Sequence, residues 1–321
     1  IFGVAILLMN QISVKSRKSY TTVTGKSGQI SKFNLGRSGK YIIAIILIII
    51  TFFTSIFPIV SFAFETFLPN PGDYSFLYTG DPDNLTTKWW VTNENITENG
   101  MYGQQGILYN DMIWHAYKGT IMVSVCCALT AGTIGTLIGY AVSKNRRSRW
   151  ANYVNSMAFL PYLMPSIAVG VAFFILFSNK YVNLFNTYAL LIIVGTVKYI
   201  PFASRSSLNS MLQLSGEIEE AAIIQDIPWT KRMTRIIIPI QKTSIISGYL
   251  LPFMTCLREL SLFILLCVQG FILSTTLDYF DEMGLYAFSS GINLILIVTI
   301  LICNALVNKA TGASLDKGIG G

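Results

Sequence analysis

Few side chains in this sequence of 321 residues could carry out covalent chemistry. His115 is the only histidine, and no cysteine, aspartate or glutamate repeats near it at the spacing of metal ligands. All five cysteines lie in apolar runs, where they are expected to pack as small hydrophobic side chains. No Ser-His-Asp set and no pair of carboxylates can be assembled from what remains. The sequence therefore predicts no catalytic residue, no metal site and no enzyme activity.

One short stretch looks like the end of a phosphate-binding loop. Thr24-Gly25-Lys26-Ser27 has the required lysine and hydroxyl residue, but Tyr20 stands where such a loop needs a second glycine. Without that glycine the backbone amides cannot form a cradle for phosphate. We expect a basic turn here, and no cofactor bound by this chain.

The composition places the chain in a membrane. Hydrophobic residues make up 52% of it, charged residues only 12%, and the mean hydropathy is +0.55. A soluble domain carries about 25% charged residues, and so little charge cannot cover the surface of a water-exposed body of this size. The composition therefore excludes a soluble enzyme, a disordered scaffold and a disulfide-rich secreted domain.

Six apolar runs are long enough to cross the hydrocarbon of a bilayer, which takes about 20 helical residues. They are residues 41–64, 116–142, 151–177, 184–203, 243–269 and 284–307. We therefore expect an all-α, polytopic bundle of six transmembrane helices. Residues 1–12 are too short to cross, and we interpret them as the end of a truncated preceding helix.

The distribution of basic residues predicts the topology, because cytoplasmic loops are rich in lysine and arginine. Residues 13–40 contain seven basic and no acidic residues, which predicts a cytoplasmic linker. Residues 65–114 contain seven acidic residues against Lys88 alone, which predicts an outer loop. The transmembrane domain would then span residues 41–310, and the tail 311–321 would be cytoplasmic. Asn84 and Asn95 in the outer loop match the pattern of N-glycosylation sites, and we interpret both as chance matches in a polar loop.

The inside loop 205–242 has an internal order that is unusual for a connector. Residues 217–225 predict a short amphipathic helix with acidic residues at its positive end. Asp226 is expected to cap a second short helix, which has Pro228 in its first turn and closes at Pro239. Two such helices projecting from a membrane domain suit a cleft on a soluble partner, where Glu220 offers a carboxylate to an arginine.

The same loop carries a motif with a specific spacing. Glu220-Ala221-Ala222 is followed after three residues by Asp226, and after nine more by Ile236, one residue and Ile238-Pro239. This spacing resembles the Glu-Ala-Ala loop of the membrane subunits of bacterial ABC importers. Asp226 stands where that family has glycine, and Ile238 where it has leucine. Because the turn glycine is expected to have a positive φ, which Asp tolerates better than most residues, we expect a positive φ at Asp226.

The resemblance implies a fold, a location and a set of partners. The fold would be that of a type I ABC importer permease (MetI-like), in the bacterial cytoplasmic (inner) membrane. Glu220, Ala221, Ala222, Asp226 and Pro239 would couple the chain to separate ATPase subunits, which bind ATP and Mg. An external binding protein would deliver the substrate, and a first permease half or a second permease copy would complete the pathway. Lipid would surround the spans, and no nucleic acid is expected.

Three further pieces resemble the iron(III)-type permeases of that family. They are Phe-Leu-Pro-Tyr-Leu-Met-Pro at 159–165, Lys-Tyr-Ile-Pro-Phe at 198–202 and Leu-Arg-Glu-Leu-Ser at 257–261. Residues 20–26 resemble the linker that joins two six-span halves in this branch. We therefore expect the C-terminal half of such a permease, with ferric iron as the substrate. The alternatives are a permease for a polyamine, phosphonate, thiamine or an oxyanion, or a membrane sensor or scaffold that does not transport.

Two charged residues are predicted inside the membrane. Arg258 and Glu259 fall near the middle of the run 243–269, where a charge costs roughly 2.5 kcal/mol or more. On a helix, adjacent side chains point about 100° apart, so these two cannot fully neutralise each other. They either line or gate the translocation path, or form a buried structural pair.

Small and helix-breaking residues mark two other runs. Pro161 and Pro165 interrupt the run 151–177, either beside the translocation path or as an ordinary kink. Gly132, Gly135 and Gly139 share one face of the run 116–142, which predicts close packing of that helix against a neighbour.

Overall fold

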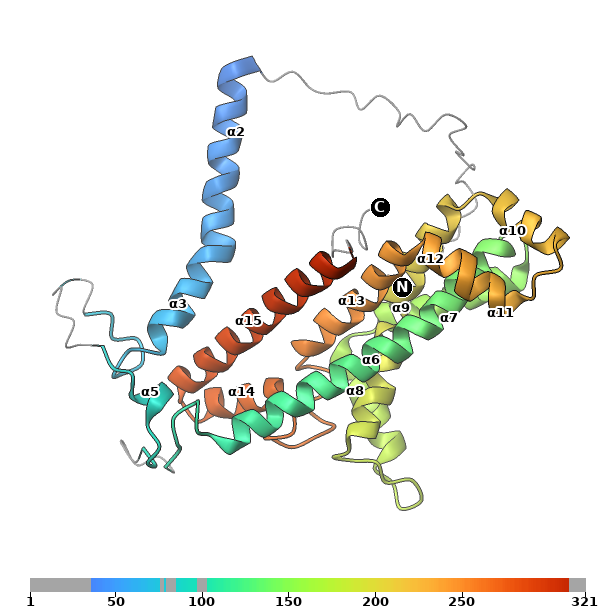
Figure 1. The fold of residues 1–321 in the computed structure, drawn as a ribbon. Coiled ribbons are helices and arrows are strands. Elements are labelled where there is room, and N and C mark those ends of the chain that lie inside the picture. Colours follow the sequence, from blue (N-terminus) through green and yellow to red (C-terminus); the bar gives the residue numbers. More distant parts are fainter. Residues whose placement is uncertain (1–35, 76–77, 79–84, 97–102, 312–321) are drawn as a thin grey trace. The chain divides into compact units, whose positions relative to one another are not determined.

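The computed structural model describes residues 36–75, 78, 85–96 and 103–311 (Figure 1). Apart from two isolated β-bridges, the regular structure of these residues is helical. The described residues divide into two compact units, one containing 116–275 and 299–311, the other containing those between 36 and 115 together with 276–298. The predicted stub 1–12, most of the basic linker, Asn84 and the tail beyond 311 lie outside the described residues.

The first unit contains the helices that position the Glu-Ala-Ala loop. They are α6 (Asp111–Lys144), α7 (Arg149–Leu163), α8 (Ser166–Phe177), α9 (Tyr188–Gln213), α10 (Gly216–Ile224), α11 (Trp229–Arg232), the π-helix η4 (Met233–Ile237), α12 (Ile238–Ile240), α13 (Lys242–Leu257), the start of α14 (Leu273–Glu282) and the end of α15 (Tyr286–Thr311).

Helix α9 lies at the centre of this unit. It packs against α13, α7 and α8, and 56% of its most apolar stretch is buried. Leu190, Leu191 and Val194 lie in a core cluster with residues of α6 and of the segment after α13, including Cys127 and Phe263. Helix α9 is long enough to span a membrane, but other parts of the protein cover much of its surface.

The glycines of α6 allow it to approach α9 and α13 closely, as predicted. A Cβ atom added at Gly135 would lie 2.5 Å from the Cβ of Ala203 and 2.7 Å from the backbone nitrogen of Ser204. One added at Gly139 would lie 2.7 Å from the nitrogen of Leu208, and one at Gly132 would overlap the ring of Tyr249. The contact between α6 and α9 thus runs along the backbone of both helices.

Four of the six predicted spans correspond to helices long and apolar enough to cross a membrane: Ser38–Glu65, Asp111–Lys144, Tyr188–Gln213 and Tyr286–Lys309. Two further helix pairs pass the same test but are sharply bent. The pair α7 and α8 bends by 101°, at Pro165, and the pair Trp229–Ile240 and α13 bends by 86°. The count is six if each bent pair is one span.

The predicted span 243–269 is wrong in its second half, because α13 ends at Leu257 and residues 258–272 form turns. Arg258 is the exposed residue that follows the helix, so neither it nor Glu259 lies in the middle of one. The side-chain carboxylate of Glu259 accepts a hydrogen bond from the backbone nitrogen of Leu262 (3.1 Å). The backbone carbonyl of Glu259 accepts a second one from the Ser274 hydroxyl (2.7 Å). These bonds give the backbone an alternative to the helical ladder, which an apolar run does not reveal.

The second unit begins with α2 (Gly36–Thr51), the π-helix η1 (Phe52–Ile56) and α3 (Phe57–Glu65), which together form the apolar span Ser38–Glu65. The most apolar stretch of that span has no buried residue. The short helix α5 (Lys88–Val91) follows, and its Trp89 donates a hydrogen bond to the carbonyl of Leu68 (2.8 Å) and packs edge-on against Phe288. This buried tryptophan fixes the polar segment that follows α3.

Replacing Gly135 by alanine is expected to force α6 away from α9, because the backbone of Ser204 cannot move aside as a side chain can. Overpacking of this kind costs about 1–3 kcal/mol. Thermal unfolding of the purified protein in detergent should show a lower midpoint. The control is Gly216→Ala, because the atom nearest to its added Cβ is 3.7 Å away. An unchanged midpoint in Gly135→Ala would show that the two helices are not held by backbone contact.

Candidate functional site

The Glu-Ala-Ala loop folds into the two short helices α10 and α11, as the sequence predicts. Ser215 caps α10, and its hydroxyl accepts a hydrogen bond from the nitrogen of Glu217 (3.4 Å). Glu217 and Glu219 lie in the first turn, where the partial positive charge of the helix end stabilises them. Helix α9 continues to Gln213 before the loop begins.

Asp226 forms the turn that ends α10. Its φ is +51°, as expected for a residue in the place of a turn glycine. Its nitrogen donates to the carbonyl of Ile223 (2.9 Å), and the nitrogen of Ile227 donates to that of Ala222 (3.1 Å). This pair of bonds around a left-handed residue is the Schellman arrangement that closes helix C-termini.

Two details of the predicted second helix are wrong. Asp226 does not cap it, because the residue at the N-cap of α11 is Pro228, and Asp226 belongs to the end of α10. Pro239 does not close it either: the helical path continues through η4 and α12 to Ile240 and turns at Gln241. Because the helical path is continuous here, the missing N–H of Pro239 removes one bond from its ladder, directly after the π-helix in which the nitrogen of Ile238 donates to the carbonyl of Met233.

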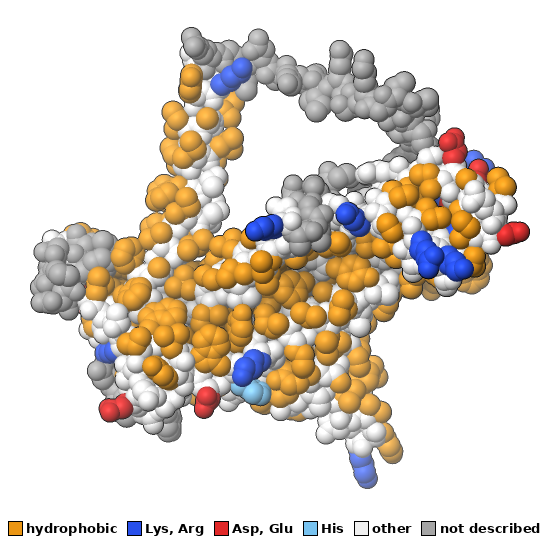
Figure 2. All heavy atoms as spheres, in the orientation of Figure 1, with side chains coloured by type: hydrophobic (Ala, Val, Ile, Leu, Met, Phe, Trp, Pro, Cys, Tyr) orange, Lys and Arg blue, Asp and Glu red, His pale blue; other side chains and the backbone are white. Residues whose placement is uncertain are grey.

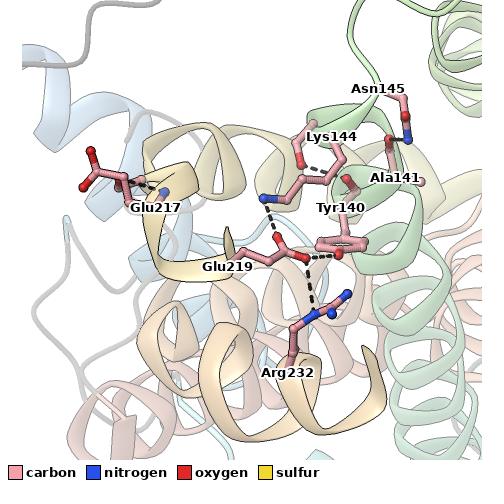
Figure 3. A network of polar contacts seen from close by, with 9 residues as sticks. Tyr140, Ala141, Lys144, Asn145, Glu217, Glu219 and Arg232 are labelled. Carbon is pink, nitrogen blue, oxygen red and sulfur yellow. Dashed lines mark hydrogen bonds and ion pairs between the residues drawn. The ribbon is translucent and has the colours of Figure 1, made fainter. Parts of the chain in front are cut away.

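The buried carboxylate of Glu219 joins three helices (Figure 3). It accepts a hydrogen bond from the Tyr140 hydroxyl and forms an ion pair with Lys144, both from the end of α6. The Nε of Arg232, from α11, lies 3.9 Å from Oε1 of Glu219, the oxygen that also accepts from Tyr140. Arg232 also donates to the carbonyl of Ile227 (3.1 Å), which ties down the turn between α10 and α11. The side chain of Glu219 is only 6% exposed.

The electrostatic environment keeps Glu219 ionised. Burial on its own raises the pKa, but hydrogen bonds from Lys144 and Tyr140 and the positive charges of Lys144 and Arg232 outweigh it. The pKa of Glu219 therefore lies below its usual value of 4.5. The carboxylate thus connects the loop to α6 through Tyr140 and Lys144, and α10 to α11 through Arg232; removing these two cations would leave the buried charge of Glu219 unpaired.

Apolar contacts reinforce this connection. Met233 and Ile237 of η4 pack with Met211 of α9 and Ile245 of α13 in a buried cluster. The ring of Trp229 lies 6.2 Å from that of Tyr140, between centroids. The loop is thus held to α6, α9 and α13 by both charge and packing.

The opposite side of α10 is exposed. Glu220, Ala221 and Asp226 lie on the surface, whereas Ala222 is buried against the domain. Ile224 is 83% exposed, and Ile223 and Trp229 are also exposed. Figure 2 shows acidic, basic and hydrophobic side chains gathered over the part of the chain that carries α10 and α11. The loop therefore has one anchored face and one open face of mixed character.

Comparison with known proteins gives the context for this loop. Residues 131–313 match the family described as binding-protein-dependent transport system inner membrane components. The chain belongs to this family. The matched range contains the whole Glu-Ala-Ala loop and its anchors on α6.

Curated relatives of this inner membrane component differ in the substrates that their names give. A putative ferric transport system permease of Haemophilus influenzae is 24% identical over 83% of the chain, and one of Actinobacillus pleuropneumoniae is 22% identical over the same share. A putrescine transport system permease of Escherichia coli is 26% identical over 61% of the chain and 68% of its own length. The chain spans about two fifths of the length of the ferric relatives, 39% and 36%.

Solved structures support the fold. A bacterial ABC transporter involved in alginate import aligns with a TM-score of 0.61 at 16% identity, over 85% of this chain and 98% of that one. The same kind of transporter in complex with an alginate-bound periplasmic protein aligns with a TM-score of 0.59, at 15% identity, over 86% of this chain and 96% of that one. The inner membrane component therefore has the expected permease fold.

The residues predicted for a path or gate lie away from the loop, at the two helix breaks of the first unit. Pro165 directly precedes α8 and lies at the break, as predicted. Pro161 lies inside α7, which continues to Leu163, so the prediction that it also interrupts the helix is wrong. The Glu259 carboxylate accepts a hydrogen bond from the Tyr199 hydroxyl of α9 (3.0 Å). Arg258 and Glu259 do not act as a pair, since Glu259 is engaged by α9 and Arg258 is exposed.

From the sequence we predicted Glu220 as the residue that contacts a partner, but we did not identify Glu219, which anchors the loop to α6. Glu219 lies three residues before the buried Ala222, and residues at this spacing share a helix face. Adjacent glutamates point about 100° apart, so one of the two had to face inward. The spacing from Ala222 is the signal that could have identified Glu219.

Replacing Glu219 by glutamine is expected to loosen α10, because a hydrogen bond to a charged group contributes about 1.5–3 kcal/mol. Amide hydrogen exchange in α10 should then be at least about tenfold faster, since 1.4 kcal/mol is a factor of ten. The matched control is Glu217→Gln, whose side chain points away from the network in Figure 3.

The stabilisation of α10 by Glu219 should depend on pH in a definite direction. Because the pKa of Glu219 is lowered on folding, its contribution is present above about pH 4.5 and is lost as the pH falls below that value. Exchange in α10, corrected for the intrinsic rate, should therefore accelerate below pH 4.5 in the unchanged protein and not in Glu219→Gln. Equal protection of α10 in both proteins at pH 7 would contradict the anchoring role.

The turn predicts opposite effects for two substitutions of Asp226. Asp226→Gly should keep or raise stability, because glycine adopts a positive φ freely, whereas Asp226→Val should cost roughly 1–2 kcal/mol. Thermal unfolding of the two variants in detergent measures the difference. Equal midpoints would mean that the turn does not keep its left-handed conformation.

Proposed function

We propose that this chain is a permease subunit of an ATP-driven importer, and that the Glu-Ala-Ala loop couples it to ATPase subunits on the cytoplasmic side. One observation carries the proposal: α10 and α11 are fixed to the ends of membrane helices on one face and open on the other. The motif spacing and the family of the chain agree with this role.

The open face has the composition of a docking surface. Ile223, Ile224 and Trp229 expose apolar area, which marks interaction sites when it is surrounded by polar residues. Ala221 allows a partner to approach the helix closely, and Glu220 offers a carboxylate for a bidentate bond from an arginine. A soluble subunit with a cleft rich in arginine fits this face.

The anchored face gives the mechanism. A displacement of α10 by the partner pulls on Glu219, and the ion pair with Lys144 transmits that displacement to α6. The cluster of Met233, Ile237 and Met211 transmits it to α9. Closure of two ATPase subunits would thus move the membrane helices and switch the cavity between inward-facing and outward-facing states. The chain itself would not hydrolyse ATP.

We propose ferric iron as the substrate, delivered by an external binding protein. The support comes from the two ferric permeases, whose similarity extends over more of the chain than that of the putrescine permease. A periplasmic protein bound to a solved transporter of the same fold supports the delivery step. A first permease half or a second copy of the chain would supply the other side of the pathway.

Replacing Glu220 by lysine is expected to abolish uptake while leaving the protein inserted in the membrane, because the exposed carboxylate is lost without damage to the buried anchor. Co-purification with the ATPase subunit and uptake of radioactive ferric iron measure this effect. The matched control is Glu217→Lys, at another exposed position on the same helix. Full uptake and normal co-purification in Glu220→Lys would overturn the coupling role.

The substrate is tested separately in cells that lack the gene and carry it on a plasmid. Restoration of ferric iron uptake supports the proposal. Restoration of putrescine or molybdate uptake instead would keep the importer and replace the substrate, in line with the other relatives. A protein that restores none of these and retains no ATPase subunit would favour a membrane sensor or scaffold.

A further inference from the structure

The break between α7 and α8 leaves two backbone carbonyls without helical donors. In a continuous helix the carbonyl of Pro161 would accept from the nitrogen of residue 165, but that residue is proline and has no N–H. Met164 has an extended backbone (φ −87°, ψ 136°), so its carbonyl is outside the helical ladder. Inside a membrane protein such groups must find other partners, because no bulk water is available.

Lys198 of α9 donates a hydrogen bond to each of these two carbonyls. Its Nζ donates to the carbonyl of Pro161 (3.1 Å) and to that of Met164 (2.6 Å). Lys198 is 8% exposed. Among the described residues, both ion pairs involve Glu219, and neither involves Lys198. Both of these hydrogen bonds from Lys198 go to carbonyls at the end of α7.

A positive charge suits this place better than a neutral donor. The carbonyl end of a helix carries a partial negative charge, which a cation in the last turn stabilises. Two carbonyls in a fixed position also determine where α7 stops relative to α9. The cost of burying the ammonium is offset by these two bonds only while the break is present.

The neighbouring residue holds the second break. Tyr199 donates to the Glu259 carboxylate, at the point where α13 gives way to turns. Helix α8 also touches the segment that follows α13, since a Cβ added at Gly170 of α8 would lie 2.7 Å from the carbonyl oxygen of Leu262. Two successive residues of α9 thus fix two discontinuous segments that touch each other.

We propose that Lys198 is a positioning residue that sets the bend between α7 and α8, and that transport requires this bend. The geometric part stands on the contacts of Lys198 alone. The second part rests on the proposed function, since it concerns the path that the bent segment would line.

The test uses three variants of the full chain. Lys198→Met removes the donor, and Lys198→Arg keeps a cation with several donors. The double variant Lys198→Met, Pro165→Ala restores an N–H at position 165, which can bond to the carbonyl of Pro161 as in a continuous helix. Lys180→Met, at an exposed loop position, controls for the loss of a positive charge.

The bend is measured by pulsed electron paramagnetic resonance between spin labels at the exposed positions Tyr153 of α7 and Leu176 of α8, after the five native cysteines are replaced. With a rise of 1.5 Å per residue on each side of the break, straightening should lengthen this distance on the order of 10 Å. We expect the longer distance in the double variant, with a normal yield of folded protein, and the original distance in Lys198→Arg and Lys180→Met.

Uptake of radioactive ferric iron by the assembled transporter gives the second readout. We expect the double variant to fall below about a tenth of the unchanged protein, because it satisfies the carbonyls but loses the bend, whereas Lys198→Arg keeps most of the activity. If the double variant regains both the original distance and normal uptake, Lys198 only fills two bonds and the proposal is wrong. Absence of iron uptake in the unchanged protein would count against the proposed substrate and leave the distance measurement to decide the role of Lys198.

Discussion

The structure depends on one constraint, which is that every backbone polar group inside a membrane domain needs a hydrogen-bond partner that lipid cannot supply. Regular helices meet this requirement by themselves, but the chain breaks its helices after Leu163 and after Leu257. Helix α9 resolves both breaks, with Lys198 bonded to the carbonyls of one and Tyr199 bonded to the Glu259 carboxylate at the other. This explains why the most buried of the long apolar helices also carries a charged residue.

The Glu-Ala-Ala loop meets a different requirement, because it lies where helices end and would have to stay in place during the partner contact that we propose. Glu219 achieves this with a charge that is matched by Lys144 and Arg232. The exposed Glu220 beside it is free to act outward. Two adjacent glutamates therefore have separate tasks, and the direction in which each side chain leaves α10 decides which task it has.

Much of the fold was predictable because apolar length and motif spacing act locally. The long helices, the glycine contacts of α6 and the positive φ of Asp226 all follow from such patterns. The end of α13 was not predictable, since residues 258–272 are as apolar as a span and only contacts with Tyr199 and Ser274 show why they turn. The anchors of Glu219 were missed for the same reason: Tyr140 and Lys144 lie far from it in sequence.

The glycine contacts of α6 have a mechanical consequence. Gly135 and Gly139 place the backbone of α6 against α9, where the added Cβ atoms would meet backbone atoms and only the small side chains of Ala203 and Ser207. Such a contact leaves little space in which the helices could slide, so we expect α6 and α9 to move together. One end of α6 carries Lys144 beside the loop, and α9 carries Lys198 and Tyr199. A displacement of the loop would then move both helix breaks together.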